Sequence, residues 1–256
     1  MLGATLLLWL LWLPNPVKPK IQKIHWKRFV WCALLGITVN QLLFIKGLSM
    51  TYSIHASLLM LTTPILVTIL ASLILGEQLT LLKITGLLLG ACGATILILG
   101  RKNKGMGMNV ILGDAFVIIN AICYSYYFVL VKPLMKRYSP IMVLRVLFTI
   151  GTFAALPVCW NEFSTIPWEK YENMHFMLLA LIVVGGTFFA YLFNIYGIKH
   201  LGPSISGSYI YTQPVFAAVI AMIVLHEPLD YYKLIAAAFI FTGVYLTNRS
   251  KRFSNG

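Results

Sequence analysis

Two carboxylates are the first candidates for chemistry in this chain, because Glu77 and Glu227 each end a long apolar run. Paired carboxylates can act as a general acid and a general base. Each glutamate, however, lies in a short turn and precedes a residue that can begin the next helix, Thr80 or Asp230. Capping and turn closure explain both residues better than catalysis, so we predict a structural role for them.

Arg145 is the charged residue that lies deepest in an apolar run, about 7 Å along its helix from the nearer end. It can bind a substrate carboxylate, or its long side chain can reach the membrane surface, and both interpretations remain open. Uncharged polar side chains inside the apolar runs are further candidates for a substrate site, with hydrogen bonding between helices as the alternative. These candidates are Asn40, Thr62, Thr63, Asn120, Tyr124, Tyr191, Asn194, Tyr209, Tyr211 and Gln213.

Pro64 and Pro214 lie inside apolar runs, where each removes a backbone donor. The carbonyl groups of Met60 and Ile210 then lack their helical partners, and in a membrane they need a side chain, a water molecule or a substrate instead. We therefore predict a helix break or hinge at each proline, beside a central site. A static kink is the alternative.

Other kinds of site are not indicated. His55 and Asp114 lie near the outer ends of two apolar runs and are weak substitutes for a proton relay. No GxxxxGK[ST] motif occurs, so direct use of ATP is not expected. The cysteines have no metal-ligand spacing, so we predict neither a metal nor a cofactor.

The composition is that of a membrane protein. Hydrophobic residues make up 59% of the 256 residues and charged residues only 11%, with a mean hydropathy of +0.85. A soluble domain of this size needs a more charged surface. The net charge of +13 comes from lysines and arginines in the links between apolar runs, which is typical of membrane proteins and argues against a nucleic-acid partner. The expected partner is the lipid bilayer.

The apolar runs have the length of about 20 residues that a membrane-spanning helix needs. Residues 1–13 form a shorter run, predicted to be a partial span. The predicted spans lie at about residues 28–48, 54–75, 80–100, 111–132, 140–160, 176–198, 203–225 and 229–248. Lysine and arginine favour the links on the side of the C-terminus, so we predict a multi-pass protein of the plasma (inner) membrane with a cytoplasmic C-terminus.

The chain repeats itself, because residues 47–83 return at 197–233 in one register. The matching pairs include Pro64/Pro214, Glu77/Glu227 and Gly93/Gly243. An odd number of spans separates matching segments, so the two copies cross the membrane in opposite directions, as in many secondary transporters. We divide the chain into a first repeat at 1–100, a linker at 101–110, a second repeat at 111–248 and a basic cytoplasmic tail at 249–256.

The repeat also predicts an incomplete first half. Shifted into the second copy, residues 1–13 fall on the second half of the span at 140–160, and the span at 111–132 has no earlier counterpart. A complete duplication has five helices in each half. We therefore expect an all-α membrane protein with a ten-span, inverted-repeat architecture, in which this sequence lacks the first span and part of the second.

Two motifs carry a resemblance to a known family. They are PILVTILASLILGEQLT at 64–80 and PVFAAVIAMIVLHEPLD at 214–230, each followed by a glycine-containing apolar run. This combination resembles the EamA-type transporters of the drug/metabolite transporter superfamily. The resemblance implies ten spans, both termini in the cytoplasm, and export of amino acids, metabolites or drugs.

The resulting functional prediction is a secondary transporter that exports small organic solutes, such as amino acids, by alternating access between two inverted halves. A non-transporting scaffold or an inactive truncated transporter is the alternative. An intramembrane hydrolase is less supported, because position 230 is Asp where an HExxH motif needs His, so we do not predict an enzyme. Gly86 and Gly90 form a GxxxG motif that can pack helices within the chain or in a homodimer.

Overall fold

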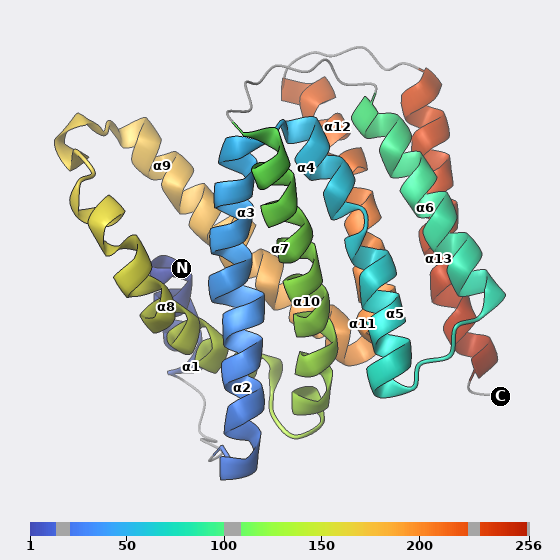
Figure 1. Ribbon diagram of the computed structural model, residues 1–256, viewed down its shortest axis with the longest axis horizontal. Helices are drawn as coiled ribbons and strands as arrows, with labels where there is room; N and C mark the ends of the chain where they lie inside the picture. The colour runs from blue at the N-terminus through green and yellow to red at the C-terminus, as the bar shows by residue number, and fades with distance from the viewer. Residues whose placement is uncertain (14–20, 100–108, 225–230, 255–256) are drawn as a thin grey trace. The chain divides into compact units, whose positions relative to one another are not determined.

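The computed structural model describes residues 1–13, 21–99, 109–224 and 231–254, and every regular element in these ranges is helical (Figure 1). The α-helices are α1 (Leu2–Trp12), α2 (Trp26–Ala33), α3 (Val39–Met50), α4 (Ser53–Met60), α5 (Thr63–Leu75), α6 (Leu81–Leu99), α7 (Val110–Val131), α8 (Pro140–Ser164), α9 (Asn173–Leu181), α10 (Ala190–Leu201), α11 (Pro203–Ser208), α12 (Gln213–Val224) and α13 (Tyr231–Ser254). Turns of π-helix at Leu34–Thr38 and Ile182–Phe189 join α2 to α3 and α9 to α10.

Five helical segments of the described residues are long and apolar enough to cross a membrane. They are Lys23–Met50, His55–Leu75, Val110–Lys136, Pro140–Ser164 and Asn173–Leu201. Shorter apolar helices lie at Leu2–Trp12, Leu81–Ile96 and Leu234–Arg249. The prediction of an all-α protein with several membrane-spanning helices is therefore confirmed, whereas the ten-span arrangement and the missing first span stay predictions.

Contacts between helices divide the chain into two compact units. Unit 1 contains Met1–Gln41 and Leu130–His200, and unit 2 contains Leu42–Val129 and Leu201–Gly256. Each unit thus takes segments from both halves of the sequence repeat. The predicted repeat boundaries stay predictions, and most of the predicted linker lies outside the described residues.

In unit 1, α8 packs against α1 and against the segment that joins α2 to α3. The hydroxyl groups of Thr5 and Thr152 are hydrogen-bonded at 2.9 Å, and Thr38 donates to the carbonyl of Gly151 at 3.0 Å. Gly151 permits this approach, because a Cβ there would lie 2.7 Å from the Ile37 side chain. The predicted partial span at the N-terminus is therefore a helix that packs within unit 1.

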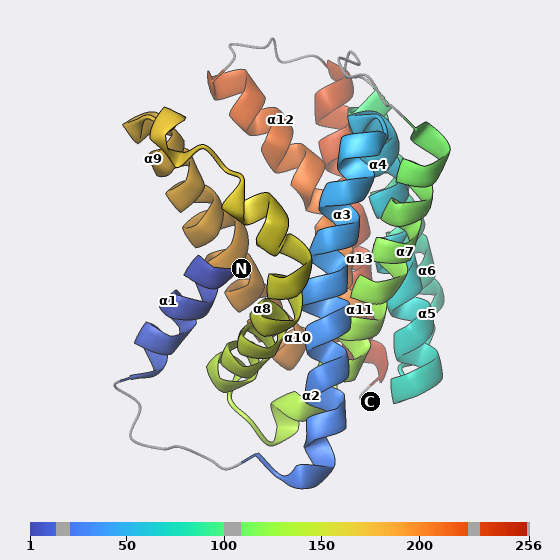
Figure 2. The same ribbon diagram turned by 60° about the vertical axis from the view of Figure 1, so that its left-hand side comes forward.

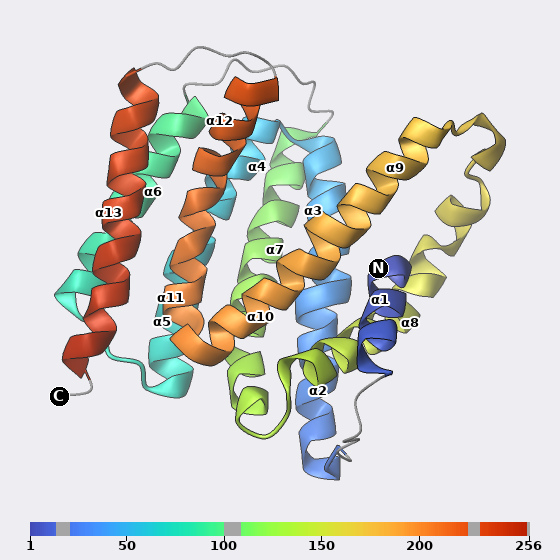
Figure 3. The ribbon, with the colours of Figure 1, turned by 180° about the vertical axis from the view of Figure 1, so that it is seen from behind.

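In unit 2, α6 and α13 lie side by side along most of their length (Figures 1 and 3). A Cβ on Gly86 would lie 2.6 Å from the carbonyl oxygen of Gly243, and a Cβ on Gly93 would lie 2.7 Å from that of Ala236. The residue numbers rise along one helix as they fall along the other, so the helices are antiparallel. The predicted GxxxG motif thus packs against another helix of the same chain, and a homodimer stays a prediction.

Candidate functional site

The first helix break separates α4 from α5. Helix α4 ends at Met60 and α5 begins at Thr63, so Pro64 lies in the first turn of α5, where no helical donor is lost. The hydroxyl of Thr62 donates a hydrogen bond to the carbonyl of Leu59 at 2.7 Å. The same carbonyl also accepts the backbone N–H of Thr62 at 3.1 Å, so two hydrogen bonds from Thr62 close the turn at the break.

The second break precedes α12. A 3-10 turn at Tyr209–Thr212 follows α11, and Pro214 is in the first turn of α12. The hydroxyl of Tyr211 donates to the carbonyl of Leu61 at 3.1 Å. Positions 61 and 211 are equivalent in the sequence repeat, so the two breaks are joined by a contact between equivalent residues.

A pocket of about 380 Å³ in unit 2 adjoins both breaks. Met60 and Leu61 contribute from the first break, and Ile210, Gln213 and Pro214 contribute from the second. The remaining lining residues are Phe44, Leu48, Ala56, Ser57, Ile98 and Ala217. A mostly apolar pocket of this size with a few polar groups is typical of sites for small organic molecules.

Gln213 and Pro214 are the predicted site residues that line this pocket. Tyr209 and Tyr211 have other contacts: the hydroxyl of Tyr209 accepts a hydrogen bond from the Asn248 amide at 2.7 Å, and the ring of Tyr211 packs over Gly90. These contacts fit the alternative role of holding helices together. Binding roles for the two tyrosines stay predictions.

Three further predicted site residues belong to unit 2, namely Thr63, Asn120 and Tyr124. Thr63 and Asn120 are buried. The ring of Tyr124 packs against Tyr127 and Phe128, with centroid distances of 5.8 and 4.9 Å. The aromatic contacts lie within α7 itself, so they fix the orientation of Tyr124 and leave its predicted binding role untested.

Asn40, Tyr191 and Asn194 are predicted site residues of unit 1. Tyr191 is buried, and its hydroxyl donates to the carbonyl of Gly36 at 2.9 Å and to the Asn40 side-chain oxygen at 3.4 Å. Asn194 lies one turn further along α10 and is half-buried. The structure thus brings Asn40 and Tyr191 together, in a hydrogen bond that ties α10 to the α2–α3 segment.

Arg145, also in unit 1, packs against two aromatic rings of α1. Its guanidinium carbon lies 4.5 Å from the ring centroid of Trp9 and 4.3 Å from that of Trp12. The indole N–H of Trp9 donates to Thr149 at 3.1 Å, which fixes that ring. The electron-rich ring faces attract the cation, a contact that the sequence reasoning did not consider. Binding of a substrate carboxylate by Arg145 stays a prediction.

Replacing Arg145 by alanine is expected to lower the free energy of unfolding by about 1 to 2 kcal/mol, because both cation–π contacts are lost. Arg145→Lys keeps a cation and should lose less. Thermal unfolding of the purified protein in a mild detergent measures the effect, with the exposed Lys136→Ala as the control. Equal melting temperatures for the two alanine variants would contradict a stabilising role of the tryptophan contacts.

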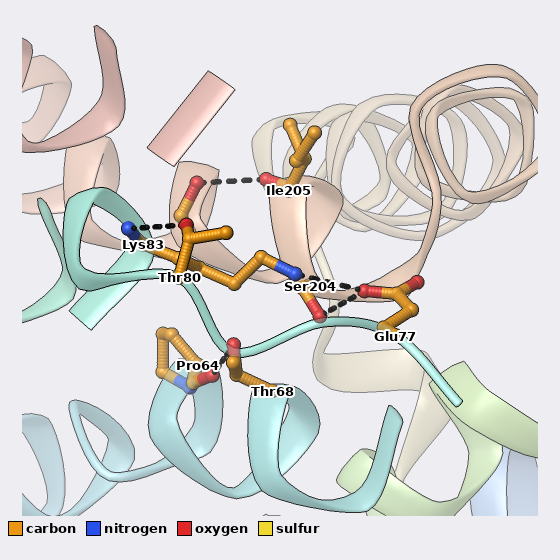
Figure 4. A network of polar contacts seen from close by, with 8 residues as sticks. Pro64, Thr68, Glu77, Thr80, Lys83, Ser204 and Ile205 are labelled. Carbon is orange, nitrogen blue, oxygen red and sulfur yellow. Dashed lines mark hydrogen bonds and ion pairs between the residues drawn. The ribbon is translucent and has the colours of Figure 1, made fainter. Parts of the chain in front are cut away.

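The carboxylate of Glu77, at the turn between α5 and α6, forms a hydrogen bond and an ion pair (Figure 4). The hydroxyl of Ser204 donates to its Oε2, and Nζ of Lys83 lies 3.4 Å from the same atom. Gly202, just before α11, has a φ of 95°, and a Cβ there would lie 3.1 Å from Oε1 of Glu77. The carboxylate therefore joins the α5–α6 turn to the start of α11.

The same turn carries its own capping contacts. Gly76 ends α5 in the left-handed conformation with a φ of 71°, and the hydroxyl of Thr80 accepts a hydrogen bond from the N–H of Lys83 at 3.2 Å. These contacts support the predicted structural role of Glu77. Glu227 lies outside the described residues.

His55 and Asp114 form one cluster in unit 2. The carboxylate of Asp114 accepts a hydrogen bond from the hydroxyl of Thr51, and its Oδ2 lies 3.2 Å from Nδ1 of His55. Both side chains are partly exposed. Across the described ranges, no group of three or more His, Cys, Asp and Glu side chains is placed to hold a metal ion.

The apolar lining of the pocket was missed by the sequence reasoning. Phe44, Ala56, Ile98 and Ala217 line the pocket, yet residues of these types also fill the core and the lipid-facing surface. Only polar residues stand out from an apolar run. The one usable signal is the position of the prolines, because Met60 and Ile210 lie four residues before Pro64 and Pro214.

Comparison with known proteins identifies the family. The EamA-like transporter family matches residues 1–99 and 111–249, which is nearly the whole chain. The chain belongs to this family. Membership in the drug/metabolite transporter superfamily, predicted from the two proline motifs, is therefore confirmed.

The relatives of this EamA-like protein include named transporters. The uncharacterized transporter YvbV of Bacillus subtilis is 27% identical over 91% of this chain and 77% of its own length. The "Probable terminal-alkyne amino-acid exporter" of Streptantibioticus cattleyicolor is 26% identical over 85% of this chain and 71% of its own. One solved protein crystal structure aligns with a TM-score of 0.78 at 17% identity, over 96% of this chain and 84% of the other, which shows that the fold is shared.

Proposed function

We propose that this protein is a secondary transporter that exports small organic solutes by alternating access. The observation that carries the proposal is the pocket of about 380 Å³ that adjoins both proline breaks. Broken helices beside a pocket bring backbone groups within reach of a substrate, and they provide positions at which a helix can bend. The membership of the chain in a transporter family supports the same function.

Contacts between equivalent positions support the proposed inverted halves. Gly86 packs against Gly243, and their counterparts in the repeat, Ala236 and Gly93, pack against each other. Reciprocal contacts of this kind are expected where a two-fold axis relates two copies. The antiparallel direction of α6 and α13 supports copies that cross the membrane in opposite directions, as in inverted-repeat transporters.

Amino acids or related metabolites are the proposed substrates. Among the described residues, the pocket lining contains no charged side chain, and its side-chain polar groups are those of Gln213 and Ser57. Such a lining favours a neutral or zwitterionic solute with an apolar part over a strongly charged one, because a net charge would lose its hydration without a partner. The amino-acid exporter among the relatives supports this choice.

The proposed location is the plasma membrane, with the C-terminus in the cytoplasm. Its support is the distribution of lysine and arginine among the links, including the basic residues at 249–252. In this orientation the pocket alternately opens to the cytoplasm and to the outside.

The test is efflux from liposomes that contain the purified protein and a mixed pool of amino acids, followed by mass spectrometry. Ala217→Trp places a large ring in the pocket and is expected to slow efflux by about tenfold or more, since filling a packed site costs over 1 kcal/mol. Ala190→Trp, at an exposed position of α10, makes the same change outside the pocket and should leave efflux unchanged.

Three outcomes count against the proposal. Efflux that is unchanged in Ala217→Trp would move the substrate site away from this pocket. Absence of efflux in the wild type, with amino acids and with a wider metabolite pool, would favour a non-transporting scaffold. Conversion of a solute inside the liposomes would favour an enzyme.

A further inference from the structure

A second cavity, of about 450 Å³, lies in unit 1 at the beginning of the first long span. Its lining is basic and amphipathic, with Ile24, His25, Lys27, Arg28, Trp31 and Leu130. We propose that this cavity binds the headgroup of an anionic phospholipid. The proposal is independent of the solute pocket, which lies in unit 2.

The cations of this cavity form no ion pair with an acidic side chain in the part of the chain that the structure describes. Lys27 and Arg28 are exposed, and neither forms an ion pair with a carboxylate of the described residues. The acidic residues of unit 1 are Glu162, in the last turn of α8, and Glu169 and Glu172, which follow that helix. Residue 162 is about 33 Å along that helix from its first residue, since each residue adds about 1.5 Å. An anion from outside the chain is thus the natural partner of these side chains.

The helical segment that lines the cavity is held by contacts with Tyr138. Nδ1 of His25 lies 2.9 Å from the hydroxyl of Tyr138, which also accepts a hydrogen bond from the N–H of Gln22 at 3.1 Å. Phe29 is fully buried, and its ring packs against Tyr138 with a centroid distance of 5.5 Å. Figure 2 shows the first turns of α2 beside the segment that follows α7. These contacts fix the helical face that carries Lys27 and Arg28.

The position along the span fits a lipid headgroup. The apolar segment begins at Lys23, so Lys27 and Arg28 lie about 6 to 8 Å inside its first residue, at the depth of the interface. Ile24, at 80% exposure, and Trp31, at 57%, present apolar surface beside the cations. A basic pocket at the end of a span with exposed tryptophan is suited to a molecule that has both an anionic head and acyl chains.

Short-chain phosphatidylglycerol is the probe, added to the full chain in a neutral detergent while thermal unfolding is recorded. It is expected to raise the melting temperature with a saturable dependence, whereas phosphatidylcholine of the same chain length should not. In Lys27→Gln/Arg28→Gln, half-saturation should require about 30-fold more lipid, from the usual contribution of two basic residues near anionic lipid.

Two further variants make the test decisive. Lys23→Gln/Lys136→Gln removes the same charge from exposed positions outside the lining and should keep the wild-type midpoint. Leu130→Phe keeps every charge but fills part of the cavity, so it should weaken binding even if the double glutamine variant does not fold. The proposed site would be overturned if the control variant weakened lipid binding as much as Lys27→Gln/Arg28→Gln does. It would also be overturned if Leu130→Phe kept the wild-type lipid concentration at half-saturation.

The acyl chains are tested separately. Glycerol phosphate and inorganic phosphate carry the anionic group alone and are expected to have little effect at the same concentration. If either reproduces the full shift, the ligand is a free phosphate compound and the lipid proposal is wrong. If phosphatidylcholine is as effective as phosphatidylglycerol, the basic residues do not select the headgroup and the proposal is equally overturned.

Discussion

Gly243→Ala is expected to lower the free energy of unfolding by about 3 kcal/mol, at the upper end for over-packed sites. The added Cβ would lie 2.5 Å from the carbonyl oxygen of Gly86 and 2.6 Å from the backbone nitrogen of Gly90. Both atoms belong to the backbone of α6, so no rotamer change relieves the clash and the two helices have to separate. Thermal unfolding in detergent measures the loss.

The control is Gly185→Ala, because a Cβ at Gly185 meets no atom within 4 Å. It should be neutral or slightly stabilising, since alanine is the better helix former. Gly90→Ala is expected to lie between the two, because its Cβ would meet the ring of Tyr211 at 2.5 Å and a ring can move more easily than backbone. A Gly243→Ala variant as stable as Gly185→Ala would contradict the close packing of α6 and α13.

The helical segments could be predicted because hydropathy along the chain reports them directly. The predicted spans at 28–48 and 54–75 correspond to Lys23–Met50 and His55–Leu75. The interior of a span is harder to predict. The π-helical turn at Leu34–Thr38 could not be predicted, because it does not change the hydropathy of the segment. Within this turn, the carbonyl of Gly36 accepts a hydrogen bond from the hydroxyl of Tyr191.

The candidate site could be predicted only in part, because a polar residue in a span has two possible uses. Asn40, Tyr191 and Gln213 are all polar residues inside apolar runs, so the sequence does not distinguish them. In the structure, Asn40 and Tyr191 are hydrogen-bonded to each other, whereas Gln213 lines the pocket. The contact between Arg145 and the rings of Trp9 and Trp12 joins segments far apart in the sequence. Only the fold brings such residues together.

Glu77→Ala is expected to lower the free energy of unfolding by about 3 to 5 kcal/mol, because it leaves the buried cation of Lys83 without its partner. The side chain of Lys83 is only 8% exposed. The substitution also removes the acceptor for Ser204. Glu77→Gln keeps an oxygen for that hydroxyl and should lose less. Glu162→Ala, at an exposed position of α8, is the control and should have little effect.

The double variant Glu77→Ala/Lys83→Met separates the charge from the hydrogen bond. A methionine fills a similar volume without a charge, so the double variant should be more stable than Glu77→Ala alone, even though it carries one more substitution. The remaining loss then reports the Ser204 contact and the start of α11. If instead the loss in the double variant equals the sum of the losses in Glu77→Ala and in the single variant Lys83→Met, the two residues are not coupled. The turn is then held by its Gly76 and Thr80 capping contacts rather than by the ion pair.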